Sequence, residues 1–225
     1  MAVTLLPSKN ESLRLSGEVN YQNSTVEFAG IGGEISQPRD EIILDNGDRL
    51  VIDIASDGFA GRFDRLTTIG APEFGIIGLA TPSDVIPNQG LARYNGSSEL
   101  VVQQGDDVFE LTADVELNLN LEFRQDVQIR ITNLEGTKFP ALGPQEAVSL
   151  DGEIRISEIT RDDTALSGGE FDIVGTPFAV TYQAETDLNG QFFGPNGEEV
   201  GATFVIDNVG TNATLIMGDI LAEQQ

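Results

Sequence analysis

The acidic side chains are the groups in this sequence that could do chemistry, because its 225 residues include 37 Asp and Glu but no His and no Cys. Two carboxylates at a suitable separation can hydrolyse a glycosidic bond. Acidic residues are so frequent along this chain that no such pair stands out. Without imidazole or thiol, His-assisted and Cys-based nucleophilic catalysis are excluded. We therefore predict that the protein is not an enzyme and assign no catalytic residue.

Metal and cofactor sites are also not indicated. Asp45 with Asp48, and Asp162 with Asp163, supply oxygen ligands of the kind that calcium prefers. Neither pair follows the D-x-D-x-D-G spacing of a calcium loop, and the intervening Asn46-Gly47 turn explains the first pair. A zinc site of Cys and His is excluded by composition. The sequence predicts no metal site and no cofactor.

Two tyrosines could in principle ligate haem iron, Tyr94 and Tyr182. Each lies in a strand-like pattern, which favours a role in the core or in a hydrogen bond.

The segment 57–65, DGFAGRFDR, combines two aromatic and two basic residues in an acidic chain with only 7% aromatic residues. Arginine and aromatic side chains are frequent anchors at interfaces. The alternative is an ordinary strand whose two phenylalanines face the core of the N-terminal part. We predict ligand binding through this segment, by Phe59, Arg62, Phe63 and Arg65.

The formal net charge of -25 limits the partners. A strongly acidic surface repels phosphate backbones and anionic membranes, so nucleic-acid binding is not expected. The sequence has no apolar stretch long enough to span a bilayer. The first ten residues also lack the basic start and apolar block of a signal peptide.

Period-two alternation of apolar and polar residues predicts an all-β protein. From Ala113 to Phe123 every second residue is apolar, which places one face of an extended strand in a core. A second alternating run, 127–131, follows a short turn, so the two predict a hairpin. The apolar run Ala213 to Leu221 predicts a last strand that closes a barrel.

Asn-Gly pairs predict the turns of further hairpins, because both residues tolerate a positive φ. They occur at Asn46-Gly47, Asn189-Gly190 and Asn196-Gly197. Gly201 predicts a bend or bulge at a barrel corner.

One domain boundary is indicated at 76–90, IIGLATPSDVIPNQG, where two prolines lie among small and polar residues. We predict a β-rich handle domain over residues 1–80. We predict an antiparallel barrel of about eight strands over residues 81–225.

Three segments of the second half carry a resemblance to a known family: 81–96, then 109–133, then LNGQFFGPNGEEVGATF at 188–204. They resemble the C-terminal barrel of the transferrin-binding protein B family, whose penultimate hairpin carries a phrase of the type F-x-G-P-x-A-E-E-V-G-G-x-F. Haemophilin-type haem carriers and related surface lipoproteins share that barrel. The likeness covers roughly residues 80 to 225. Gly197 and Ala202 depart from the family phrase.

The resemblance implies a non-catalytic bacterial binding protein, extracellular or on the outer-membrane surface, that captures a host protein or nutrient ligand. It also implies a lipid anchor or release from the cell, and we expect a monomer. The absence of His argues against haem held as the His-using carriers hold it. The alternative is a structural or adhesive β-module that self-associates through edge strands in a surface or phage assembly.

Overall fold

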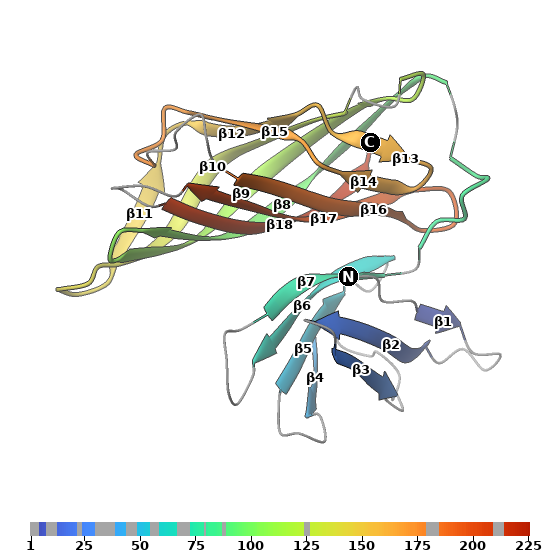
Figure 1. Cartoon of the computed structure of the whole chain (residues 1–225), viewed down its shortest axis with the longest axis horizontal. Helices are drawn as coiled ribbons and strands as arrows, with labels where there is room; N and C mark the ends of the chain where they lie inside the picture. The colour runs from blue at the N-terminus through green and yellow to red at the C-terminus, as the bar shows by residue number, and fades with distance from the viewer. Residues whose placement is uncertain are drawn as a thin grey trace.

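The structure is a computed structural model that describes residues 5–7, 13–21, 24–29, 39–43, 49–54, 59–66, 73–78, 80–86, 89–123, 127–178, 185–208 and 214–225. Over these residues every regular element is a strand, as the sequence predicted. Figure 1 shows a large curled sheet and smaller sheets formed by the N-terminal part of the chain. None of the described residues forms a helix that is long and apolar enough to cross a membrane.

In the described residues the N-terminal part forms two small antiparallel sheets. The first contains β1 (Leu5–Pro7), β2 (Leu13–Tyr21) and β3 (Ser24–Ala29). The second, called the handle sheet below, contains β4 (Arg39–Ile43), β5 (Arg49–Ile54), β6 (Ala60–Leu66) and β7 (Glu73–Gly78), in that order. Strands β4 and β5 pair as the predicted hairpin, up to Ile43 opposite Arg49. The predicted Asn46-Gly47 turn lies outside the described residues.

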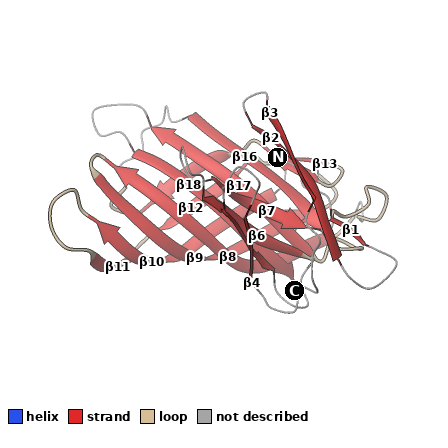
Figure 2. Cartoon of the chain, turned by 90° about the horizontal axis from the view of Figure 1, so that it is seen from below, coloured by secondary structure: helices blue, strands red, loops and turns tan. Residues whose placement is uncertain are grey.

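The second half of the chain forms one antiparallel sheet of eleven strands in the described residues, called the barrel below. The long strands lie side by side and tilted in Figure 2. In chain order the strands are β8 (Leu91–Gln104), β9 (Asp107–Asn120), β10 (Val127–Phe139), β11 (Glu146–Leu150), β12 (Glu153–Ser157), β13 (Thr160–Asp162), β14 (Ala165–Ser167), β15 (Glu170–Val174), β16 (Glu185–Phe193), β17 (Glu199–Asn208) and β18 (Thr214–Gln224).

One hairpin of the barrel is kinked, so that each of its two strands is divided into two shorter ones. Strands β12 and β13 follow each other across Glu158, which has a φ of 55°. Strands β14 and β15 follow each other across Gly168 and Gly169, with φ values of 75° and 119°. The half β12–β15 of this hairpin pairs with β10, and the half β13–β14 pairs with β16. When each kinked pair counts as one strand, and β11 as an addition to β10, eight strands close in a ring.

The core lies inside the barrel, on the face that the alternation predicted. On β9 the buried residues alternate with exposed or half-buried ones from Phe109 to Asn120. Strand β10 continues the hairpin with Val127 opposite Leu119. The prediction failed only at Phe123, which lies beyond the end of β9 and is 59% exposed.

One of the turn predictions was wrong. Asn189 and Gly190 lie within β16, where they pair with Thr203 and Ala202 of β17 instead of forming a turn. The ladder runs through Gly201 on both sides without a register shift, so there is no bulge at this residue, and the alternative of a bend stays a prediction. The Asn196-Gly197 turn is confirmed: it lies between β16 and β17, and Gly197 has a φ of 76°.

Candidate functional site

The handle sheet contacts the barrel through an ion pair that begins at β6. Arg62 Nε donates a hydrogen bond to Asp219 Oδ1 of β18 over 2.8 Å, and Arg62 Nη2 donates to the Ser97 carbonyl over 2.8 Å. Glu99 Oε1 lies farther from Arg62 Nε, at 3.7 Å. Asp219 is only 3% exposed. The ion pair is therefore largely shielded from water and from salt, unlike an exposed surface pair.

Burial dominates the electrostatics of this contact. It raises the pKa of Asp219 to about 6, against the lowering effect of the Arg62 guanidinium and of the Glu99 N–H group. A carboxylate withdrawn from water favours its neutral form, and a neighbouring cation offsets only part of that cost.

A second barrel carboxylate holds the start of β6. Glu199 of β17 accepts hydrogen bonds from the Phe59 N–H at 2.9 Å and from the Ala60 N–H at 2.6 Å. Glu199 is 5% exposed. Its two oxygens thus satisfy two backbone donors at the start of β6, where Ala60 also pairs with Gly78 of β7. Both carboxylates belong to the barrel, and both bind β6 of the handle sheet.

Glycines allow the two sheets to approach closely here. A Cβ atom added at Gly78 would lie 2.6 Å from Phe193 Cδ1, and one added at Gly201 would clash with Ile76 Cγ2. Beyond β7, Ala80 forms a β-bridge with Phe193, and the Thr81 N–H donates to the Phe192 carbonyl over 3.0 Å. The chain therefore passes from the handle sheet to the barrel along the edge of β16.

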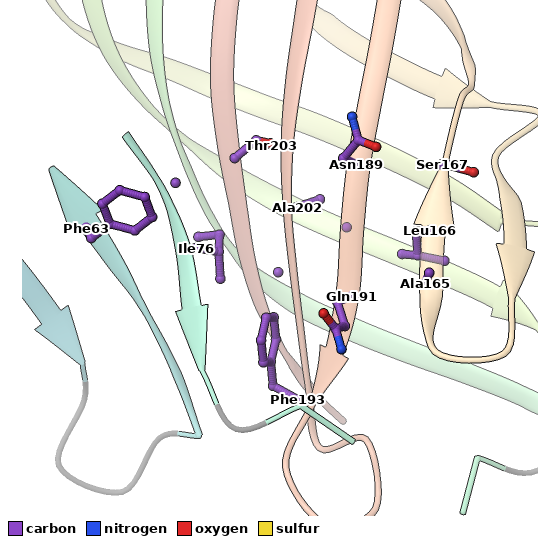
Figure 3. A pocket seen from close by; sticks show the side chains of 13 residues that line it. Phe63, Ile76, Ala165, Leu166, Ser167, Asn189, Gln191, Phe193, Ala202 and Thr203 are labelled. Carbon is purple, nitrogen blue, oxygen red and sulfur yellow. The ribbon is translucent and has the colours of Figure 1, made fainter. Parts of the chain in front are cut away.

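A groove of about 270 Å³ lies between the handle sheet and the β13–β14 hairpin, on the outer wall of the barrel. Figure 3 shows Phe63 and Ile76 on one side, Leu166 and Ser167 on the other, and Asn189 and Gln191 between them. None of its lining residues is charged, although 22% of the residues in the whole chain are charged. The lining residues are Phe63, Gly75, Ile76, Ala165, Leu166, Ser167, Asn189, Gly190, Gln191, Phe193, Gly201, Ala202 and Thr203.

The structure brings three of the four predicted ligand-binding residues to the contact between the handle sheet and the barrel. Phe59 is half-buried, Arg62 is bound to Asp219, and Phe63 is 4% exposed in the wall of the groove. Arg65 pairs through its backbone with Leu50, and its side chain lies outside the described residues. Ligand binding by these four residues stays a prediction.

The sequence reasoning missed the barrel side of the contact, Glu199 and Asp219. An Asp inside the apolar run 213–221 was the available signal, because a buried acid requires a partner. Nothing local distinguishes Glu199 from the other acidic residues.

Tyr94 has the hydrogen-bonded core role that the sequence favoured. Its hydroxyl donates to the Gly197 carbonyl over 2.8 Å, and its ring packs edge-on against Phe192 at 6.0 Å between centroids. Burial, assisted by the Glu198 carboxylate, raises the pKa of Tyr94 to about 12.

Tyr182, Asp45 and Asp48 lie outside the described residues. In the part of the chain that the structure describes, no three His, Cys, Asp or Glu side chains gather as a metal site would require.

A comparison with family models matches residues 86–222 to the C-lobe and N-lobe beta barrels of Tf-binding protein B. The chain belongs to this family of transferrin-binding protein B barrels. The resemblance found in the sequence is thereby confirmed. The matched range contains Glu199 and Asp219, whereas Phe59 to Arg65 precede it. The contact therefore joins a transferrin-binding protein B barrel to a handle sheet outside the matched range.

Individual relatives agree with this assignment. Transferrin-binding protein B of Haemophilus influenzae is 27% identical over 145 residues, which cover 62% of this chain and 22% of the relative. A Trp-176-Ala mutant of transferrin-binding protein B from Haemophilus parasuis has a similar fold, with a TM-score of 0.57 at 17% identity. The likeness covers 92% of this chain and 40% of that one. Transferrin binding protein B from Neisseria meningitidis also has a similar fold, with a TM-score of 0.56 at 15% identity. That likeness covers 97% of this chain and 40% of the other. The chain thus spans about a fifth of its curated relative.

Proposed function

We propose that this chain is a non-catalytic bacterial binding protein, extracellular or on the outer-membrane surface, that captures a host protein. The observation that carries the proposal is the family match over residues 86–222, whose relatives are named for transferrin binding. The composition supports it, because the chain lacks the His and Cys groups of common catalytic sites. We propose a handle domain over residues 1–80 and a barrel domain over 81–225, with the chain acting as a monomer.

We place the capture surface at the uncharged groove between the handle sheet and the barrel. An interface core is depleted of charged residues relative to the remaining surface, and this groove is an uncharged surface on an acidic protein. Amides and hydroxyls there, from Asn189, Gln191, Ser167 and Thr203, offer hydrogen bonds to a partner. The predicted residue Phe63 forms part of its wall, and Arg62 holds that wall in place through Asp219.

The test is binding of host transferrin, iron-loaded and iron-free, to the immobilised full chain. Saturable binding is expected, and binding that does not saturate in either iron state overturns capture of transferrin. The groove is tested with Ala165→Trp, which adds a bulky ring to an exposed lining residue. The matched control is Ala147→Trp, on strand β11, which is exposed at this residue and contributes no residue to the groove. We expect a loss of about tenfold or more for Ala165→Trp alone.

One observation favours a second function, that of a self-associating β-module. In the described residues β11 pairs only with β10, so its outer edge presents unpaired backbone groups. The size of the particle at two concentrations distinguishes the two functions. A monomer at both concentrations supports the capture protein, and growth with concentration that Val148→Pro abolishes supports the module.

A further inference from the structure

The side chain of Arg161 is buried in the barrel, near one of its ends. It is the middle residue of β13, pairs through its backbone with Leu166 of β14, and is only 7% exposed. Its Nη2 donates to the carbonyl of Leu121, the first residue after β9, over 3.1 Å. Figure 1 shows β13 at the end of the barrel where the C-terminus lies.

The guanidinium of Arg161 has fewer hydrogen-bond partners than a buried cation requires. In the described residues the Leu121 carbonyl is its one hydrogen-bond acceptor, and Arg161 Nε has no partner. Three other arginines are bound to acids: Arg62 of the handle sheet to Asp219, and Arg130 and Arg155 of the barrel to Glu153. An arginine cannot escape the cost of burial by losing its proton, because it stays charged in proteins. A buried cation with a free donor is a site for an anion.

We propose that Arg161 makes this end of the barrel a binding site for a small carboxylate. A carboxylate oxygen would accept the hydrogen bond that Arg161 Nε can donate, and the planar guanidinium matches the geometry of a carboxylate. The proposal does not depend on capture of a host protein.

The neighbours of Arg161 define the rest of the ligand. Leu121, Ile159 and Leu166 are buried and apolar, so a carboxylate with an apolar body fits better than a polyanion. The interior beyond them is filled by the core, including the fully buried Phe192. The ligand must therefore be short and remain at the barrel end. Exposed acids such as Glu122 and Asp162 repel anions from the outside, which further disfavours ligands of higher charge.

The first experiment observes Arg161 Nε directly. Arginine Nε–H signals of the ¹⁵N-labelled full chain are followed by NMR during titration with benzoate, at an ionic strength held constant with chloride. The Arg161 signal is assigned by its loss in Arg161→Lys. We expect it to shift and reach a plateau, while the exposed Arg155 does not.

Three parallel titrations make the assignment specific. Acetate should produce a plateau at a higher concentration than benzoate, because it lacks the apolar ring. A plateau with benzyl alcohol would show that the ring alone binds, and would overturn the proposal. A plateau with sulfate and none with benzoate would overturn the carboxylate assignment. No shift of the Arg161 signal beyond that caused by chloride overturns the site itself.

The second experiment uses thermal unfolding of the full chain. Benzoate should raise the unfolding midpoint of the unchanged protein and of Arg155→Met, because a ligand that binds only the folded state stabilises it. It should not raise the midpoint of Arg161→Met. An equal rise in Arg161→Met overturns the proposal. Should Arg161→Met fail to fold, the NMR titration of the unchanged protein decides.

Discussion

Arg62 and Asp219, 157 residues apart in the chain, form a 2.8 Å ion pair that joins the handle sheet to the last strand of the barrel. The second acid of this contact is Glu199, which accepts hydrogen bonds from the N–H groups of Phe59 and Ala60. Both acids therefore belong to the barrel. Both acids are buried, and each contact fixes part of β6. The uncharged groove beside Phe63 therefore has a wall whose position the barrel determines.

The raised pKa of Asp219 predicts a specific pH dependence of stability. Its pKa is raised by burial from 3.8 to about 6 in the folded protein. The folded state therefore binds a proton more tightly than the unfolded state, so stability from this group is full below pH 3.8 and is lost as pH rises to about 6. Between pH 5 and pH 7 we expect the free energy of unfolding of the unchanged protein to fall by about 1–2 kcal/mol relative to that of Asp219→Asn. This magnitude follows from about 1.4 kcal/mol per pKa unit.

The measurement is urea unfolding of both proteins at several pH values above the sequence pI of about 4.1, where solubility is retained. The exposed Asp172→Asn is the control and should follow the unchanged protein. The free energy of unfolding of the unchanged protein minus that of Asp219→Asn should fall as pH rises. A value that is constant, or that rises with pH, would contradict the assignment.

Glu199 should be essential for holding the start of β6. In Glu199→Gln one of the two acceptor oxygens becomes an amide nitrogen, which cannot accept from the Phe59 or Ala60 N–H group. We expect a loss of about 1–3 kcal/mol in the free energy of unfolding, because a buried donor is left unsatisfied. Hydrogen exchange at Ala60 should become faster, while exchange in β9 stays slow.

Glu223→Gln is the matched control, since Glu223 lies directly opposite Glu199 on β18 and is exposed. Equal destabilisation by the two substitutions would mean that charge on this part of the sheet, and not the two N–H contacts, determines the effect.

A side chain at Gly201 should destabilise the protein, and shortening Ile76 should relieve part of that cost. A Cβ at this position clashes with Ile76 Cγ2 of the handle sheet. Overpacking of this kind costs about 1–3 kcal/mol. Gly201→Ala should therefore destabilise the protein, and Ile76→Ala should restore part of the loss in the double variant. A double-mutant cycle by urea unfolding measures the coupling, and additive effects would contradict the close approach.

The strands could be predicted from the sequence because their signal is local. The alternation on β9 records which face is buried, and Asn196-Gly197 occupies positions that need a turn. The same reasoning failed at Asn189-Gly190, because a glycine can also serve packing. A Cβ at Gly190 would lie 2.7 Å from Ala202 Cβ, so this glycine is required by the neighbouring strand and not by a turn.

The candidate site was only half accessible to sequence reasoning. The segment around Arg62 stands out by composition, whereas its partners on β17 and β18 lie more than a hundred residues away. Glu199 resembles every other acid of a chain with 37 of them. The choice of Glu199 and Asp219 follows from how the handle sheet packs on the barrel, which no local pattern records.

Tyr94 should ionise at a higher pH than an ordinary tyrosine, and the stability of the folded protein should fall at high pH. Burial raises its pKa from 10.0 to about 12, so the folded state retains the phenolic proton longer than the unfolded state. Stability from this group is present below pH 10 and is lost as pH rises to about 12. Tyr94→Phe removes the proton and also the 2.8 Å hydrogen bond to the Gly197 carbonyl, at a cost of about 1 kcal/mol near neutral pH. The cost should shrink as pH rises above 10, which urea unfolding of the two proteins measures. The absorbance of tyrosinate, compared between them, should assign the latest ionisation to Tyr94, and ionisation of that residue near pH 10 would contradict its buried environment.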